Sequence, residues 1–168
     1  FPNSPRRMEL EARLIEAYAL YGENDAVIRE GTRYLAAWPD SPRRTAVALE
    51  IANAHARRND TRQEFAIYEE QLRELAARAG GVPLGSPAGN AAAGEGELPP
   101  RSPEYARILD RYAGRLTALK RTTDALALFR RELDRNPDDP GLYERLAAFL
   151  EQNRLGAEVE QVYARALR

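Results

Sequence analysis

The sequence predicts an all-α protein, a solenoid of about four helical hairpins interrupted by a Gly/Pro/Ala-rich insertion. Three observations support this class. Apolar residues recur at helical spacing along most of the chain. The pattern of the C-terminal part repeats after 34 positions, and an N-terminal motif repeats after 37 positions. Pro and Ser residues mark the joints, because Pro starts or stops helices and Ser caps them.

The first hairpin is expected to run over residues 5–21 and 25–37, with a turn at 22–24 that contains Gly22. Its helices should pack through apolar stripes. These are Leu14, Ile15, Tyr18 and Tyr21 on one helix and Val27, Tyr34 and Leu35 on the other.

The second hairpin follows a repeated joint, because the order aromatic, Pro, Asn or Asp, Ser, Pro, Arg, Arg occurs at 1–7 and again at 38–44. In each copy a Ser cap precedes a Pro that starts the next helix. We therefore expect helices at 42–57 and 61–78, with a turn at 58–60.

Residues 80–101 break the pattern, since Gly, Ala and Pro dominate and no apolar stripe survives. A segment of this length without regular structure is uncommon inside a compact domain. Two interpretations stay open: an arm that meets a partner, with fast amide exchange, or a tolerated surface insertion. Two hairpins precede it at 1–79 and two follow at 102–168. Because two hairpins are fewer than a stable repeat array usually has, we expect one continuous solenoid domain.

The last two hairpins carry the clearest repeat, hinged on residues 136–140. Chemical class is conserved between positions that are 34 apart. The pairs are Leu109 and Tyr143, Tyr112 and Leu146, Ala113 and Ala147, Leu116 and Leu150, Ala125 and Val159, and Phe129 and Tyr163. The small residues allow close helix approach, and the aromatic residues fill the groove toward the next hairpin. Pro137 should end one helix, and Asp139 should cap the next, which starts at Pro140.

This period and its large, small, large order resemble the tetratricopeptide repeat family. The resemblance implies that the first helix of each hairpin lines a concave groove that binds a peptide. Carried onto this sequence, it implies these groove residues: Glu50, Asn53, Arg57, Arg107, Asp110, Arg111, Glu144, Arg145 and Glu151. Gly114 and Ala148 would leave room there. Some relatives clamp a terminal carboxylate, but Leu49 and Gly141 stand where that clamp requires lysines. An ordinary solvated face of ion pairs is the alternative interpretation.

The repeated joint is also similar to that of bacterial envelope proteins of this family, which favours the cell envelope or periplasm over the cytoplasm. The chain begins without Met and ends in an amphipathic pattern. We therefore expect it to be an internal fragment of a larger protein.

Composition argues against several functions. Lys plus Arg total 25 and Asp plus Glu total 26, without the basic cluster that phosphate backbones require. There is no Cys, and His55 is the only His, so it is expected to be a packed or rim residue. No apolar run is long enough to span a membrane. We therefore expect a protein that is not an enzyme, binds no cofactor, metal or nucleic acid, and does not insert into a membrane.

The remaining function is non-enzymatic binding of a protein or peptide partner. The alternative is an architectural or self-assembly segment of an envelope protein, in which the exposed C-terminal helix would form a homodimer. Single-stranded RNA binding is a third class, which the balanced charge disfavours.

Overall fold

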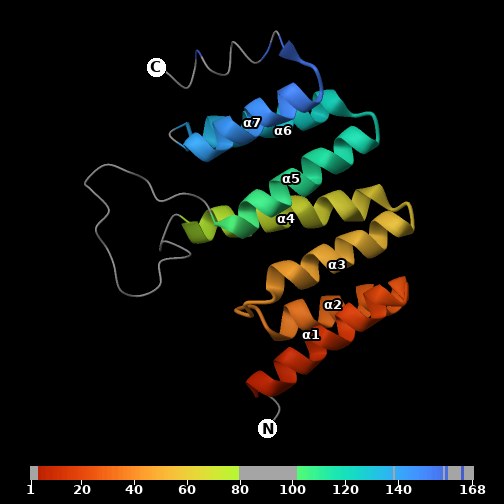
Figure 1. Ribbon diagram of the computed structural model, residues 1–168. Coiled ribbons are helices and arrows are strands. Elements are labelled where there is room, and N and C mark those ends of the chain that lie inside the picture. Colours follow the sequence, from red (N-terminus) through yellow and green to blue (C-terminus); the bar gives the residue numbers. More distant parts are fainter. Residues whose placement is uncertain (1–3, 80–101, 138, 157, 159–163, 165–168) are drawn as a thin grey trace, which may run out of the picture. The chain divides into compact units, whose positions relative to one another are not determined.

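The computed structural model describes residues 4–79, 102–137, 139–156, 158 and 164. Over these residues the chain forms seven α-helices and no strand (Figure 1), which confirms the predicted all-α class. The helices are α1 (Pro5–Leu20), α2 (Asn24–Ala37), α3 (Arg44–Arg57), α4 (Thr61–Ala79), α5 (Pro103–Ala118), α6 (Thr122–Arg135) and α7 (Pro140–Gln152). The predicted insertion at 80–101 and most of the predicted C-terminal helix lie outside the described residues.

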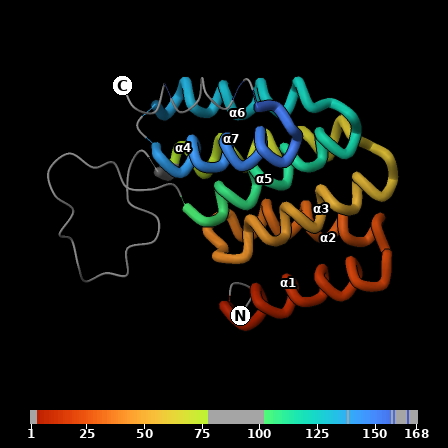
Figure 2. Tube along the Cα trace, turned by 45° about the horizontal axis from the view of Figure 1, so that its top comes forward, coloured from red at the N-terminus to blue at the C-terminus, as the bar shows by residue number. Residues whose placement is uncertain are grey.

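Two compact units divide the chain: unit 1 comprises Phe1–Glu74 and unit 2 comprises Leu75–Arg168. The border falls inside α4. Helices α1, α2 and α3 contact one another within unit 1, and α6 contacts both α5 and α7 within unit 2 (Figure 2). The predicted joining of all hairpins into one continuous solenoid stays a prediction.

The four hairpin turns share one backbone geometry. Gly22, Asn59, Lys120 and Arg154 have φ values of 75°, 58°, 59° and 59°. In each turn the next residue donates its N–H to the carbonyl five positions earlier, with N···O distances of 2.8 to 2.9 Å. The donor and acceptor pairs are Glu23 and Tyr18, Asp60 and His55, Arg121 and Leu116, and Leu155 and Leu150. This is the Schellman ending of a helix. The left-handed residues lie 37 and 34 positions apart, so the backbone reproduces both sequence periods.

The core of unit 1 forms where α1, α2 and α3 meet. Its buried side chains are Ala12, Ile15, Ala19, Val27, Tyr34, Val47, Ile51 and Ala54. Gly31 on α2 permits the close approach of α3, since a Cβ atom there would lie 2.6 Å from Cγ1 of Ile51. Two residues predicted for this interface were wrongly placed, because Leu14 is 48% exposed and Tyr21 is 81% exposed. Ala12, Ile15 and Ala19 already form the inner face of α1, and Leu14 lies about 100° around the helix from Ile15.

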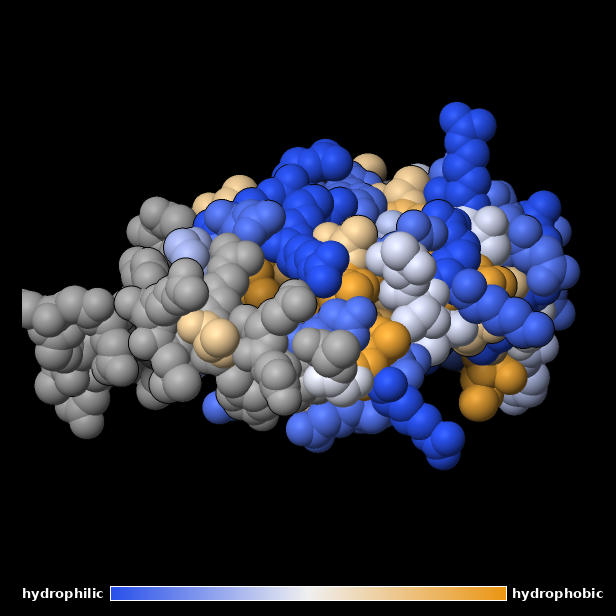
Figure 3. Space-filling model, turned by 90° about the horizontal axis from the view of Figure 1, so that it is seen from above, coloured by the Kyte–Doolittle hydropathy of each residue, from blue (hydrophilic) through white to orange (hydrophobic). Residues whose placement is uncertain are grey.

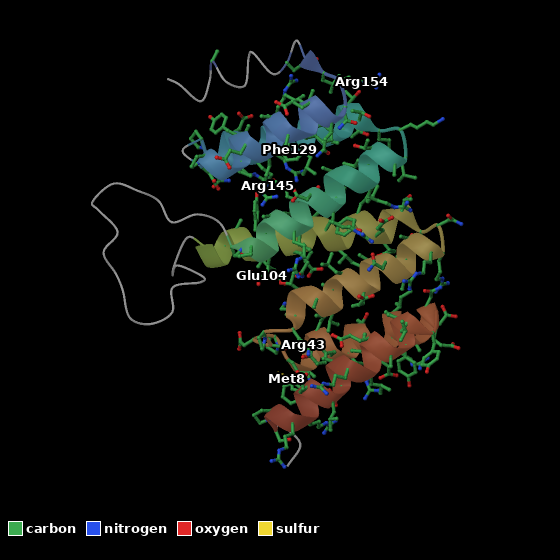
Figure 4. All side chains as sticks on the ribbon, viewed as in Figure 1. Met8, Arg43, Glu104, Phe129, Arg145 and Arg154 are labelled. Atoms are coloured by element: carbon green, nitrogen blue, oxygen red, sulfur yellow. The ribbon has the colours of Figure 1, made fainter. Side chains whose placement is uncertain are left out.

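Polar contacts tie the ends of the unit 1 helices together. Trp38 Nε1 donates to Glu11 Oε2 at 2.8 Å. Arg43, which lies near the Met8 end of α1 (Figure 4), donates to Glu9 at 2.8 Å and to Glu16 at 2.5 Å. These contacts join the beginning of α1 to the joint between α2 and α3.

Helix caps show which predicted joints are correct. Ser4 and Ser102 each accept a backbone N–H of the first helical turn, at 3.2 Å. Asp139 caps α7 by accepting from Gly141 N at 3.0 Å, as predicted. The prediction for Ser41 was wrong in part, because α3 begins at Arg44 and not at residue 42. The buried Ser41 hydroxyl is instead shared between Arg43 N at 3.0 Å and the Tyr34 hydroxyl at 2.6 Å.

Unit 2 is held by an apolar core and one buried carboxylate. Its α5 stripe is buried, with Tyr105, Ile108 and Leu109 all at most 1% exposed. The Tyr105 hydroxyl donates to Glu132 on α6, which also pairs with Arg131 and Arg135 at 3.1 Å. Because Glu132 is 1% exposed, these donors supply the partners that a buried carboxylate requires.

Candidate functional site

A pocket of about 520 Å³ lies within unit 2, where α5 and α7 run over α6. Ten residues line it: Asp110, Ala113, Gly114, Thr117, Phe129, Arg145, Ala148, Phe149, Gln152 and Asn153. Four of these, Asp110, Gly114, Arg145 and Ala148, are among the residues that the repeat resemblance places in a groove. The structure brings these four together.

The floor of the pocket is small and apolar. Gly114 and Ala148 are exposed residues on α5 and α7, and a Cβ atom at Gly114 would have no other atom within 4 Å. The lining also includes Phe129 and Phe149, whose ring centroids are 5.1 Å apart with an interplanar angle of 44°. Phe129 therefore packs against the next hairpin, as predicted. Both aromatic residues are themselves buried, at 2% and 8% exposed.

One end of the pocket is charged. Arg145 on α7 donates to the Asp110 carboxylate on α5, and their side chains are 38% and 50% exposed. Figure 4 labels this arginine on α7, with Phe129 on α6. A half-exposed ion pair of this kind adds only about 0 to 1 kcal/mol to stability. A ligand that offers its own charge can therefore replace either partner at small cost.

The other end is neutral and can donate and accept hydrogen bonds. The Thr117 hydroxyl donates to the Ala113 carbonyl at 2.9 Å, and Asn153 Nδ2 donates to the Phe149 carbonyl at 2.8 Å. The Thr117 hydroxyl oxygen and the Asn153 amide oxygen remain as acceptors, and the second N–H of Asn153 remains as a donor. Gln152 adds a second amide, which can donate and accept. Both the N–H and the C=O groups of a peptide backbone match this end of the pocket.

Three lining residues were not predicted from the sequence: Thr117, Gln152 and Asn153. Helical spacing contained a signal for the first two, because Thr117 lies seven positions after Asp110 and Gln152 lies seven after Arg145. Residues that are seven apart share a helix face. Extending each predicted stripe by one turn would have included both residues.

The other predicted groove residues of unit 2 lie outside the pocket lining. Arg107 and Arg111 are exposed on α5, and Glu144 and Glu151 are exposed on α7. They lie on the two helices that form the pocket, where they can contact a ligand longer than the pocket itself.

Three predicted residues belong to α3 of unit 1. Glu50 and Asn53 are partly buried, and Arg57 is exposed. Arg57 Nη1 donates to the Ala19 carbonyl at 3.3 Å, near the end of α1. This contact gives Arg57 a helix-capping role within unit 1. The predicted packed histidine is also here, with His55 Nδ1 located 3.3 Å from Asp60 Oδ2 and its side chain 14% exposed.

Two chemical features are absent from the described residues. No group of three or more His, Cys, Asp or Glu side chains there could hold a metal ion. None of the described helices combines the length and apolar character needed to cross a bilayer.

Comparison with known proteins gives one match. Residues 106–149, which contain most of α5, all of α6 and most of α7, match the family model described as tetratricopeptide repeat. No curated protein and no solved structure matches the chain. The matched range includes the pocket apart from its last two lining residues.

Proposed function

We propose that this chain binds an extended peptide of a partner protein in the pocket between α5 and α7. The premise is the tetratricopeptide repeat at residues 106–149, which indicates a protein–protein interaction module. The observation that supports this proposal is a pocket lining that combines two small exposed residues, Gly114 and Ala148, with the Phe129 and Phe149 side chains. Large side chains at these two positions would fill the space. A peptide side chain can occupy it instead and bury apolar surface against the rings.

Polar groups at the two ends would orient such a peptide. Thr117 and Asn153 present acceptors for backbone N–H groups at one end. At the other end the exposed ion pair of Asp110 and Arg145 can open and rebuild around a charged peptide side chain. Because the rim holds both charges, it selects for the order of charges along a peptide and not for one sign.

Filling the pocket tests its role. Random peptides displayed on phage are selected on the whole chain, and the recovered peptides are titrated by calorimetry against native protein and a Gly114→Gln variant. We expect Gly114→Gln to bind at least tenfold more weakly, since its side chain occupies the free space of the pocket. Ala36→Gln, at an exposed site on α2 of unit 1, is the matched control and should bind like the native chain. Equal affinity for both variants would remove the pocket from the binding site.

Charge reversal tests the arginines on the same helices. Replacing Arg111 and Arg145 with Glu should weaken binding of the selected peptides with little loss of helicity by circular dichroism, because both side chains lie on the solvent side of their helices. The same variant is a control in pull-downs from the source cells.

The predicted location in the cell envelope stays a proposal. Fractionation of the source cells tests it.

A further inference from the structure

Helix α1 has a second apolar face that no described residue covers. Leu10 is 67% exposed, Leu14 is 48% exposed, and Tyr21, the residue that ends the helix, is 81% exposed. The inner face of α1 is already buried by Ala12, Ile15 and Ala19. Among the described residues, the other large apolar side chains with such exposure are Leu20, beside this face, and Leu119 of unit 2.

The spacing on this face is that of a helix pair. Leu10, Leu14, Ala17 and Tyr21 are separated by 4, 3 and 4 positions, which keeps them in one line along the helix. Alternating steps of 4 and 3 residues form the heptad pattern through which two helices pack side by side. The surface therefore fits a helix, and we refer to these four residues as the α1 seam.

The order of residues in the seam suits a second copy in the antiparallel direction. A twofold axis between residues 15 and 16 sets Leu14 opposite Ala17 of the other copy, and Leu10 opposite Tyr21. Leu14 of one copy then fills the room that Ala17 of the other copy leaves, and Leu10 packs against Tyr21. A parallel pair would set Ala17 against Ala17 and leave a gap in the seam.

Charge favours the same direction. The first turn of α1 carries Arg6 and Arg7, whereas Glu23 lies in the turn after its end and Asp25 lies in the first turn of α2. Arg7 pairs with Glu11, and Asp25 pairs with Arg58, whereas Arg6 and Glu23 have no ion-pair partner among the described residues. An antiparallel pair brings the basic end of one copy to the acidic end of the other. It also aligns the helix dipoles favourably.

We propose that two copies of this chain associate through the α1 seam, as an antiparallel pair related by a twofold axis. The interface is isologous, so each residue contact occurs twice. This surface lies in unit 1 and is separate from the peptide pocket of unit 2. Self-association and peptide binding can therefore be tested separately.

Sedimentation equilibrium of the whole chain tests the association. We expect the native chain to approach a doubled molar mass as its concentration rises. Leu14→Glu should weaken the dimer at least tenfold, because it places two charges in the centre of the seam. Leu119→Glu, at an exposed leucine of unit 2, is the matched control and should dimerise like the native chain. A native chain that stays monomeric at every protein concentration measured would overturn the proposal. The α1 seam would then be left to a different partner.

Disulfide trapping tests the direction, and the absence of native cysteine makes each result unambiguous. Leu10→Cys and Tyr21→Cys chains are mixed in a glutathione buffer. An antiparallel pair gives the mixed disulfide, and neither variant alone should crosslink efficiently. Efficient crosslinking of Leu10→Cys to itself would contradict the proposed direction.

Charge exchange gives a second test of direction. Arg6→Glu should weaken the dimer, and adding Glu23→Arg to the same chain should restore it, since both contacts are then reversed together. Failure of the double variant to recover, with helicity unchanged, would contradict the proposed pairing of the helix ends.

Discussion

Glu11 is a single residue whose ionisation contributes to the stability of unit 1. It accepts from Trp38 Nε1 at 2.8 Å and from Arg7 Nε at 2.7 Å. These two donors hold the pKa of the Glu11 carboxyl below its ordinary value of 4.5. Because the folded pKa is the lower one, this contribution is present above pH 4.5 and is lost as the pH falls through the folded pKa.

We therefore expect Glu11→Gln to lower the free energy of unfolding at pH 7 and to lower it by less at pH 3. Urea titrations followed by the fluorescence of Trp38, the only tryptophan, measure the free energy of unfolding at both pH values. Glu9 responds to pH in the same direction, through Arg13 and Arg43, but it is present in both proteins and cancels in the comparison. An equal difference at the two pH values would show that the carboxylate charge does not matter.

At the scale of one element, the four hairpin turns differ in how well their residues suit them. Gly22 adopts φ of 75° without steric cost, whereas Lys120 and Arg154 reach 59° with a full side chain. A non-glycine residue in this conformation costs about 1 to 2 kcal/mol. The hydrogen bonds of the Schellman ending hold these two residues in it.

Exchanging the residue at these turns should therefore change stability in opposite directions. We expect Lys120→Gly to raise the free energy of unfolding by about 1 kcal/mol and Gly22→Ala to lower it by a similar amount. Lys120→Ala is the matched control, since it removes the same charge but keeps the strained backbone. Chemical unfolding monitored by circular dichroism measures all three. A gain with alanine equal to that with glycine would assign the effect to charge.

The elements also show what sequence patterns can and cannot predict. The order and approximate bounds of the helices followed from periodicity and from Pro and Ser positions, because these act locally. The outward position of Leu14 did not, because helical spacing alone does not show that the small residues Ala12 and Ala19 form the inner face of the helix. The left-handed Lys120 and Arg154 were not predicted either, because no glycine marks them.

For the pocket, small residues and opposite charges were predicted from the sequence, but the contacts between them were not. The resemblance to the tetratricopeptide repeat family placed Gly114 and Ala148 on the groove face, and the structure brings both to one pocket. The contact of Asp110 with Arg145 joins residues 35 positions apart, so it depends on how two helices cross. Sequence spacing fixes a position on one helix and leaves such crossings undetermined.

At the scale of the whole molecule, one face can be judged by its hydropathy. On the face in Figure 3, hydrophilic residues cover most of the coloured surface, and the apolar areas between them are small. The sequence has 25 basic and 26 acidic residues, a near balance without the excess of positive charge that is typical of nucleic-acid-binding proteins. Among the described residues, four of the five large apolar side chains that are exposed lie on α1 or at its end.

Cooperative unfolding of the two units is a property of the whole chain. The number of repeats predicts it. About three repeats are usually needed for a stable array, and the chain is predicted to have two hairpins on each side of residues 80–101. We therefore expect the two units to unfold together. Trp38 lies in unit 1, so its fluorescence reports that unit alone, whereas circular dichroism at 222 nm, a standard helix wavelength, reports helices of both units.

Heating the whole chain while recording both signals should give one common midpoint. A Phe149→Ala variant sharpens the test, because it removes the aromatic contact with Phe129 in unit 2 and should cost about 3 to 5 kcal/mol there. If the units cooperate, this change in unit 2 lowers the midpoint seen by Trp38 in unit 1 as much as the midpoint seen by circular dichroism. A Trp38 transition that stays at its native temperature while the helical signal shifts would show that the units unfold independently, because stability lost in one would then not reach the other.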